Sequence, residues 1–551
     1  MILLNTRTIY KVLFILTASI SGAYAQSDHP TKSIEPYFDL QLTDAERDSM
    51  IDNLNRYQQA IKAIHGHAID NSISPALIFN PLPRGFQINT AQTIIQWNLP
   101  KDVPLPANRE ELAFYPVHKL AVLIKNKKIT STELTKVYLN RLKKYGDTLQ
   151  CVITLMEETA LQHAKKADAE IANGKYKGPL HGIPYGIKDL LAVENTKTTW
   201  GAMPFKDQTI NTTATVVKKL NDAGAVLVAK LTMGALAMGD IWYGGVTKNP
   251  WNLKQGSSGS SAGSASATSA GLVAFAIGTE TLGSIVSPST RCGVTGLRPT
   301  FGRVSKHGAM ALSWSMDKIG PICRSALDCG MVLDVIRGED GYDPSVNNAS
   351  FNYNGKADVK KLKVAYLKTL FESRYANRAN DSIALNVMRS LGVHLTPIEL
   401  PSDIPTNALY IILTAEASAA FDELTRSNRD SLLVNQRKQA WPNSFRSARF
   451  IPAVDYINAN RIRQQLIEQY HALTKEYDVI ISPSFGGNQL LTTNLTGHPC
   501  LVMPNGFNDQ GSPTSISFLG KLFGEAELVA LGRAFQEASE WEENHPPYFK
   551  K

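Results

Sequence analysis

Hydrophobic and polar positions follow helical and strand patterns from about residue 110 onward. The segment Thr130–Glu133 has the capping-box pattern that starts helices. Apolar residues then recur at helical spacing, at Leu134, Val137, Tyr138, Leu142 and Tyr145. We expect a second helix over Glu157–Asn173, ended by Gly174.

Strand patterns alternate with these helices further along the chain. Thr213–Asp222, Gly224 and Ala225–Ala229 predict a helix, its cap and a strand. Further strands are expected at Leu362–Leu367 and Val479–Ile481, separated by the helical segments Ser382–Leu391 and Ile462–Lys475. Alternating helices and strands indicate an α/β architecture. We find no internal repeat and no clear domain linker after residue 110.

The segment before residue 109 has a different character. Residues 26–108 are polar and irregular, with one helix expected at Asp44–Ala63 and a proline-rich stretch at Pro81–Pro106. His65-Gly66-His67 has no further ligand types nearby, so we interpret it as a surface loop.

Residues 1–25 have the three parts of a secretory signal peptide. Arg7 and Lys11 supply the positive start, Val12–Ile20 is a short apolar run, and Ala23-Tyr24-Ala25 is a cleavage motif before Gln26. The apolar run is too short to span a bilayer, and no later run qualifies. We therefore expect an exported protein, periplasmic or secreted, without stable membrane insertion.

Composition narrows the class of protein. Hydrophobic residues make up 43% of the 551 residues and charged residues 19%, which is ordinary for a folded globular protein. The net charge is +8 and falls to +6 without residues 1–25. No Lys/Arg cluster is interleaved with aromatics, so nucleic-acid binding is not supported. No Walker A, zinc-ligand or dinucleotide pattern occurs, and we expect no cofactor and no metal.

The five cysteines are too few and too odd in number for a disulfide framework. Buried free thiols are the expected state. Cys323 and Cys329 are nevertheless close enough in sequence to pair in an oxidising compartment.

The stretch 256–300 carries the candidate chemistry. Serines and glycines at 256–264 precede a small-residue segment and the apolar run Leu272–Ile277. Glycines at 278 and 283 then allow a turn that aims several N–H groups at one point, as an oxyanion site beside a serine nucleophile requires. The alternative is a flexible Gly/Ser linker, but linkers are not normally followed by a core-like segment.

Four ordered motifs resemble those of the amidase signature family of serine amidohydrolases. They are Gly182–Asp189, Ser258–Ser264, Gly278–Ile285 and Cys292–Thr300. The resemblance covers roughly residues 110–545. It implies a single large mixed β-sheet covered by helices on both faces, and hence three regions: a signal peptide at 1–25, an extension at 26–108 and an amidase domain at 109–548.

The resemblance also implies the site residues. In the family a serine nucleophile, a second serine after a cis peptide bond and a lysine form the triad. The lead-in Asn249–Leu253 aligns the second serine with Ser260, which places the nucleophile at Ser284 and the lysine at Lys188. The matching oxyanion donors are the backbone N–H groups of Thr281, Leu282, Gly283 and Ser284.

Lys188 stands in the apolar segment Leu180–Leu191. Burying an ammonium is costly unless it is paired or neutralised, so a lysine here would ordinarily reach the surface. As the triad base it must instead be neutral, with a pKa of ~7–8 rather than ~10.4. The resemblance favours the second interpretation.

Several positions depart from the family pattern, none of them in the triad. Leu282 replaces a glycine, Glu280 an aspartate and Val286 a common arginine, while Ser258 and Ala262 replace glycines. We expect substrate choice to involve Met238, Trp242 and Tyr243, which are able to wall an apolar pocket.

Two other functions compete with a stand-alone amidase. Gly259–Gly263 has the form of an α/β-hydrolase nucleophile elbow with Ser261, but the preceding Asn252–Gln255 is not an apolar strand. Its base would be one of His307, His394, His471 and His498.

The chain is alternatively the amidase component of a transamidation complex, or a catalytically silent binding protein. We predict hydrolysis of a small-molecule or peptide carboxamide to the acid and ammonia or amine, and leave a homodimer open.

Overall fold

The structure, a computed structural model, describes residue 29 and residues 31–550. The predicted signal peptide and its cleavage site after Ala25 lie outside the described residues. The chain forms two compact units, the first ending at Asp70 and the second beginning at Asn71. This boundary differs from the division at 108/109 expected from the sequence.

The described part of the first unit contains a short 3-10 turn, η1 (Glu35–Phe38), and one long helix, α2 (Asp44–Gly66). Thr43 and Glu46 form a capping box, with the Thr43 N–H donating to the Glu46 carboxylate over 2.7 Å. Arg47 joins the two elements through paired bonds of 2.8 and 2.9 Å to Glu35. The predicted helix at 44–63 is thus confirmed, three residues longer than expected.

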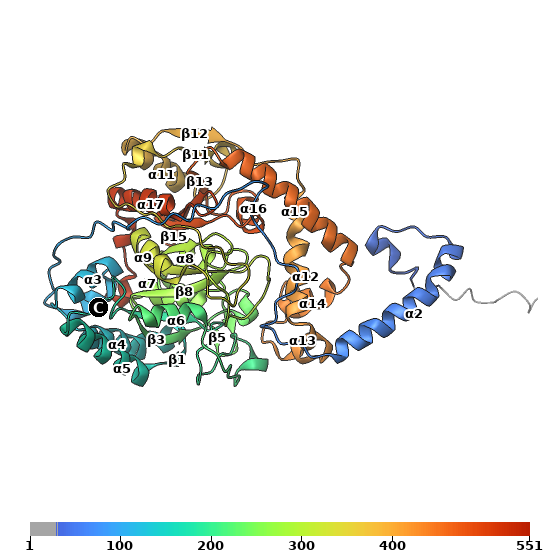
Figure 1. The fold of residues 1–551 in the computed structure, drawn as a ribbon, viewed down its shortest axis with the longest axis horizontal. Helices are drawn as coiled ribbons and strands as arrows, with labels where there is room; N and C mark the ends of the chain where they lie inside the picture. Colours follow the sequence, from blue (N-terminus) through green and yellow to red (C-terminus); the bar gives the residue numbers. More distant parts are fainter. Residues whose placement is uncertain (1–28, 30, 551) are drawn as a thin grey trace, which may run out of the picture. The chain divides into compact units, whose positions relative to one another are not determined.

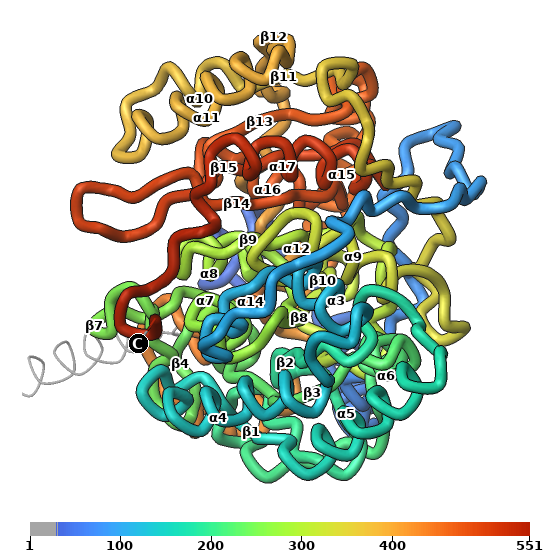
Figure 2. Tube along the Cα trace, turned by 90° about the vertical axis from the view of Figure 1, so that its left-hand side faces the viewer, coloured from blue at the N-terminus to red at the C-terminus, as the bar shows by residue number. Residues whose placement is uncertain are grey.

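In the described part of the second unit, eleven strands form one sheet, in the order β1-β3-β2-β8-β10-β9-β14-β15-β13-β11-β12. Figure 2 shows this order from β1 at the bottom to β12 at the top. The strands are β1 (Val152–Leu155), β2 (Pro184–Lys188), β3 (Val226–Leu231), β8 (Phe275–Glu280), β9 (Thr295–Arg298), β10 (Lys318–Cys323), β11 (Val364–Leu367), β12 (Leu395–Ile398), β13 (Val479–Pro483), β14 (Cys500–Phe507) and β15 (Pro513–Gly520).

The sheet is mixed. β2 pairs in parallel with β3 and β8, β11 pairs in parallel with β12 and β13, and the remaining neighbours are antiparallel. Two small hairpins lie outside it: β4 (Ile241–Trp242) with β5 (Gly245–Val246), and β6 (Lys248–Asn249) with β7 (Asn252–Gly256).

Helices surround this sheet (Figure 1). They are α3 (Val117–Lys125), α4 (Ser131–Leu149), α5 (Glu157–Ala172), α6 (Thr215–Asp222), α7 (Ala262–Ser269), α8 (Val286–Cys292), α9 (Ala326–Ile336), α10 (Lys368–Glu372), α11 (Arg378–Ser390), α12 (Tyr410–Ala420), α13 (Asp422–Arg426), α14 (Trp441–Ala448), α15 (Ala453–Thr474), α16 (Gln489–Leu495) and α17 (Glu525–Ser539).

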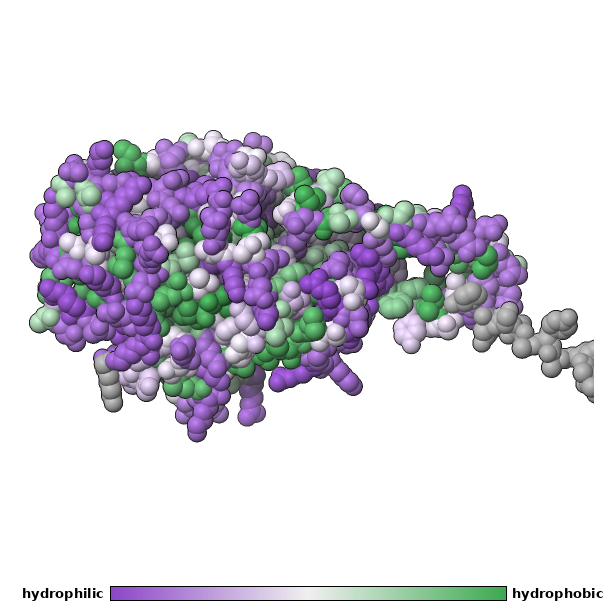
Figure 3. Space-filling view, turned by 90° about the horizontal axis from the view of Figure 1, so that it is seen from below, coloured by the Kyte–Doolittle hydropathy of each residue, from purple (hydrophilic) through white to green (hydrophobic). Residues whose placement is uncertain are grey.

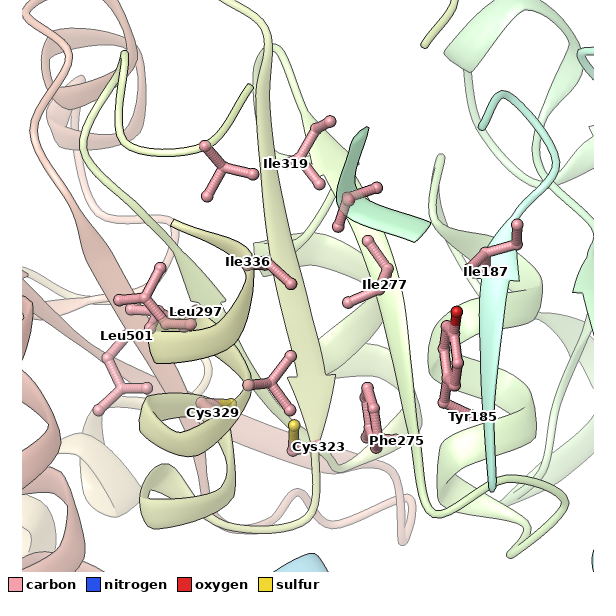
Figure 4. Packing of buried hydrophobic residues seen from close by; sticks show 14 of the residues in the cluster. Tyr185, Ile187, Phe275, Ile277, Leu297, Ile319, Cys323, Cys329, Ile336 and Leu501 are labelled. Atoms are coloured by element: carbon pink, nitrogen blue, oxygen red, sulfur yellow. The ribbon is translucent and has the colours of Figure 1, made fainter. Parts of the chain in front are cut away.

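Both faces of the sheet are buried. On one face, side chains such as Ile187, Ile277 and Ile319 form the main core with residues of α9 and α17 (Figure 4). Tyr185 and Phe275 stack across β2 and β8 there, with ring centroids 5.2 Å apart. On the other face, α4, α5, α7 and α8 cover smaller apolar clusters. Because both faces are covered, the central strands read as continuous apolar runs.

Most sequence-predicted elements are present within a few residues of their expected bounds. The exception is α15, which begins at Ala453 rather than at Ile462. Its first turns expose Val454 and Ile457 to solvent, so the apolar pattern there does not mark a buried face.

Residues 71–106, which we call the strap, have little regular structure but pack on the second unit. Val103 is buried, and other apolar side chains of the strap contact the main core: Ile95, Trp97, Leu99 and Leu105. Backbone and side-chain hydrogen bonds join the strap to 350–355, including Thr93 N–H to Asn352 over 2.8 Å. The strap therefore belongs to the second unit, because it completes that unit's core.

The surface of the molecule is mixed in polarity. Figure 3 shows hydrophilic residues over much of one face, with hydrophobic residues in patches between them. No helix among residues 31–550 is both long and apolar enough to cross a bilayer. All five cysteines are buried free thiols, and Cys323 and Cys329 are not bonded to each other.

Candidate active site

Lys188 is the last residue of β2, and Thr279 and Glu280 end the parallel strand β8. Carboxyl ends of parallel strands open at the same edge of a sheet, where α/β proteins place their ligands. The Lys188 ammonium nitrogen has no solvent exposure and lies 2.7 Å from Ser260 Oγ and 2.8 Å from Thr279 Oγ1. The side chain does not reach the surface.

Burial lowers the pKa of Lys188 to about 7, and the nearby carboxylates of Asp317 and Glu280 oppose that shift. A lysine with this pKa is neutral for much of the time at neutral pH. It is then able to accept a proton from a neighbouring hydroxyl, which an ordinary ammonium does not do.

Ser260 lies between β7 and α7, and the Gly259–Ser260 peptide bond is cis. Its carbonyl accepts a hydrogen bond from Gly234 N–H. A Cβ atom at position 259 would collide with the Gly239 carbonyl, so only glycine allows the two segments to approach this closely. The packing of loop 234–239 against Gly259 therefore places the Ser260 hydroxyl beside Lys188.

Ser261, the nucleophile of the rival elbow, is occupied by backbone contacts. Its hydroxyl donates to Thr279 O over 3.0 Å and accepts from Thr279 N–H over 3.1 Å. The preceding β7 is a short polar strand outside the main sheet and not the apolar strand that an elbow needs, as the sequence predicts.

The histidines that the elbow would need lie elsewhere. His307 stacks on Tyr342, His471 packs edge-on against Phe86, and His498 is buried beside Thr496. His394 is exposed. Among the described residues none of the four hydrogen-bonds to Ser261.

Ser284 stands in the turn between β8 and α8 and is 8% exposed. Its carbonyl accepts a bond of 3.2 Å from Ser261 N–H, which links this turn to the Ser260 segment. Gly283 has a φ of +85°, a conformation that favours glycine. No acceptor in the described chain is bonded to the N–H groups of Thr281–Ser284, so these donors are available to an oxyanion.

Glu280 holds the far side of this turn. Its buried carboxylate accepts from Ile285 N–H over 2.8 Å and from Val286 N–H over 3.0 Å. Arg298 donates to it over 2.7 Å and Asn494 over 2.9 Å. Burial alone would raise the pKa of Glu280, but the Arg298 charge and these hydrogen bonds lower it to about 2. The carboxylate is therefore a permanent anion that anchors the turn.

Asp317 holds the start of the same turn, at Thr281. Thr281 Oγ1 donates to its carboxylate over 2.5 Å, and the N–H groups of Leu312 and Ser313 donate to its other oxygen. Sequence reasoning identifies neither Thr279 nor Asp317 as a site residue. Thr279 stands inside one of the family motifs and is open to inference, whereas Asp317 is brought to the site only by the pairing of β10 with β8.

The predicted pocket residues Met238, Trp242 and Tyr243 lie on the segment that leads to and forms the β4–β5 hairpin. Met238 packs half-buried against the main core, and the Trp242 and Tyr243 rings contact each other edge to face. The cavity that reaches Thr279 and Thr281 is lined by other residues. The role of these three side chains stays a prediction.

The reactive groups that the structure brings together are hydroxyls, one amine and backbone donors. They come from β2, the loop before α7 and the turn after β8. Among the described residues, no group of three or more His, Cys, Asp or Glu side chains is arranged to hold a metal ion.

Known proteins are similar to this chain in sequence and in fold. The amidase family model matches residues 133–491. The A subunit of glutamyl-tRNA(Gln) amidotransferase from Moorella thermoacetica is 31% identical over 485 residues, covering 79% of this chain and 99% of that protein. The corresponding protein of Coxiella burnetii is 32% identical over 471 residues, covering 77% and 97%.

Solved structures of other proteins are also similar to this chain in fold. The peptide amidase of Stenotrophomonas maltophilia is 27% identical with a TM-score of 0.70, over 80% of this chain and 100% of that one. An amidase family protein of Bacillus anthracis is 26% identical with the same TM-score, over 80% and 93%. The sequence motifs, the mixed sheet and the similar proteins all indicate the same family. This chain belongs to the amidase signature family.

Proposed function

We propose that this protein hydrolyses a carboxamide through an acyl-enzyme on Ser284, with Ser260 relaying the proton to Lys188. The observation that carries the proposal is the buried Lys188 nitrogen, 2.7 Å from Ser260 Oγ and with a pKa of about 7. A neutral amine in that position is a base, and a base is what a serine needs to attack an amide.

In the first half of the reaction, Ser284 Oγ bonds to the amide carbon and its proton passes to Ser260, whose own proton passes to Lys188. The carbonyl oxygen becomes an oxyanion facing the N–H groups of 281–284. One such donor is worth roughly 3–4 kcal/mol in a related system. The C–N bond then breaks, and the relay run backwards protonates the departing ammonia or amine.

In the second half, water attacks the ester carbon and the relay removes its proton. The Ser284 C–O bond breaks, and Ser284 recovers a proton while the carboxylate leaves. Leu282 and Glu280 differ from the family pattern only in their side chains. The backbone N–H donors of residues 281–284 are therefore still present. No cofactor takes part in this sequence of steps.

A second candidate is the amidase component of an amidotransferase complex. The observation in its favour is the length and identity of the match to the glutamyl-tRNA(Gln) amidotransferase proteins. The predicted leader at 1–25 and the lack of a basic patch with interleaved aromatics support a stand-alone enzyme instead. We propose the stand-alone enzyme, exported to the periplasm or medium after cleavage near Ala25.

The decisive experiment measures ammonia release by the purified chain from aliphatic, aryl and peptide amides. We expect turnover without any partner protein or tRNA, and no turnover in Ser284→Ala. The matched variant Ser261→Ala removes a hydroxyl that bonds Lys188 over 3.3 Å but lies outside the proposed relay, and it should retain turnover. Turnover that requires added tRNA or a second protein would establish the amidotransferase candidate.

A fluorophosphonate probe followed by peptide mass spectrometry locates the nucleophile independently. Labelling should occur at Ser284 and disappear in Lys188→Met. Labelling at Ser261, or none in a folded protein, would overturn the assignment. For export, the mature protein from the producing cell should begin at Gln26 by N-terminal sequencing.

A further inference from the structure

A cavity beside the candidate site reaches Thr279 and Thr281, the residues next to Lys188 and to the predicted oxyanion donors. Ala237, from the loop that packs on Gly259, also lines it. Because Thr279 bonds Lys188 and Thr281 is one of the predicted oxyanion donors, the cavity lies beside the candidate site, although Lys188, Ser260 and Ser284 do not line it.

Part of the cavity wall comes from the start of the strap. Asn71, Ser72 and Ser74 line it, although they precede the triad by more than a hundred residues in the sequence. Asn71 is held by the backbone of Ala311, accepting from its N–H over 2.8 Å and donating to its carbonyl over 3.1 Å. A third bond of 3.4 Å runs to the Ala420 carbonyl at the end of α12.

The charged side chains on the cavity wall already have partners within the protein. Lys306 pairs with Asp343 over 3.2 Å and donates to Ser345 over 2.6 Å. Asp317 accepts from Thr281, and Lys318 donates to the Met316 carbonyl. A charged ligand group would have to displace one of these partners, which is costly where the group is buried.

The rest of the wall is apolar and aromatic, including Leu190, Met310, Leu312 and Ile319. Trp314 adds an indole ring, whose Nε1–H is itself buried. The wall as a whole thus matches an uncharged, apolar or aromatic group.

We infer that this cavity binds the uncharged, apolar or aromatic side group of the substrate amide, and that Asn71 makes the strap a specificity-determining wall of it. The inference rests on the proposed amidase activity. It names a substrate class, neutral amides with an apolar or aromatic side group, such as an N-acyl amino-acid amide with an aromatic side chain.

The substrate class is tested by kcat/KM values for three primary amides: acetamide, glutamine and N-acetylphenylalaninamide. We expect the last to be preferred over each of the others by at least about tenfold, a difference that one good apolar contact supplies. A preference for zwitterionic glutamine would overturn the inference while leaving the amidase function intact. No turnover of any amide by the wild-type enzyme would instead overturn the proposed function.

The wall is tested with Asn71→Ala against Asn352→Ala, which loosens the same strap away from the cavity. Asn71→Ala should raise KM for N-acetylphenylalaninamide about tenfold with little change in kcat, because the side-chain hydrogen bonds that anchor the cavity wall are lost. Asn352→Ala should leave both constants near wild type. Equal kinetics in the two variants would refute the role of Asn71.

A further variant changes the space in the cavity rather than the hydrogen bonds that anchor the strap. Ser74→Trp narrows the cavity and should slow labelling of Ser284 by a biphenyl fluorophosphonate, but not by an ethyl one. Unchanged probe ratios in Ser74→Trp would show that the cavity is not the substituent pocket.

Discussion

At the scale of single residues, the site depends on keeping one ammonium nitrogen out of water. Lys188 is fully buried, and its hydrogen-bond partners are three hydroxyl groups and one carbonyl, with no carboxylate among them. Hydroxyl groups can hydrogen-bond to a neutral amine. They stabilise its protonated, charged form less than a carboxylate in a direct ion pair would. The pKa near 7 follows from the burial of the amine, which the charges of Asp317 and Glu280 only partly offset.

The first prediction concerns the pH dependence of catalysis. Lys188 must be neutral in the free enzyme, so kcat/KM should rise with pH through about 7 and then level off. The measurement is the pH profile of amide hydrolysis between pH 5 and 9. A rate that falls with pH across neutrality would contradict a neutral Lys188 as the base.

The second prediction concerns stability. The Lys188 pKa is about 7 in the folded chain against 10.5 when solvated, so between these values the unfolded chain binds one more proton and stability rises with pH. Below pH 7 the penalty is constant, on the order of 5 kcal/mol at about 1.4 kcal/mol per pKa unit.

Lys188→Met removes both the charge and its penalty. The variant should be inactive yet have a higher Tm than wild type at pH 6.5, and the difference should shrink as the pH rises toward 10. Thermal unfolding of both proteins across this range provides the comparison. A Tm difference independent of pH would show that Lys188 does not carry the penalty.

At the scale of elements, the turn between β8 and α8 is held by two carboxylates, the buried one of Glu280 and the half-buried one of Asp317. Glu280 accepts four donors, two from the backbone of 285–286 and two from Arg298 and Asn494. An amide at this position would direct its NH2 group at one pair of these donors. The turn therefore needs an anion here, and glutamate supplies it where the family pattern has aspartate.

The third prediction is that Glu280→Gln destabilises the protein by about 3–5 kcal/mol, because Arg298 is left buried without its partner. The folded fraction should also lose kcat, since the donors at 281–284 are no longer held in place. Glu525→Gln is the matched control, a buried carboxylate beside Arg303 away from the site. It should lower the urea midpoint without reducing kcat per folded molecule.

At the scale of the whole molecule, the chain divides into two compact units, and the strap belongs to the unit that contains the candidate site. The strap completes the main core and lines the cavity, whereas the first unit has its own short ion-pair connection and long helix. Arg463 lies 3.5 Å from the Phe79 ring, and Phe79 packs edge-on against Phe301, so the strap also contacts α15 and the loop after β9.

The fourth prediction follows from that division. A chain lacking residues 1–70 should retain the wild-type Tm and amide kinetics. A chain lacking residues 1–108 should melt about 5 °C lower or more, because apolar core contacts are lost. Calorimetry and the amide assay on the two truncated chains make the comparison. Equal stability of both would mean that the strap is not part of the folded unit.

Predictions from the sequence agree best with the structure where the predicted feature depends on residues that are close together in the chain. The capping box at Thr130–Glu133 satisfies backbone donors within four residues, and the structure contains it. The strand at Val479 and the helix at Glu157 likewise depend on near neighbours in the chain. The strap reads as an irregular leader because it packs in an extended form without elements of its own, so no periodicity marks its buried side chains.

The amino-acid sequence by itself determined the family, the α/β pattern and the position of Lys188 in an apolar segment, because motifs and burial preferences are properties of short stretches of chain. Only the tertiary structure decided which hydroxyl Lys188 contacts, that Asp317 and Glu280 hold the turn, and that Asn71 lines the cavity. These are meetings of segments far apart in sequence, and their distances exist only once the sheet has brought its strands together.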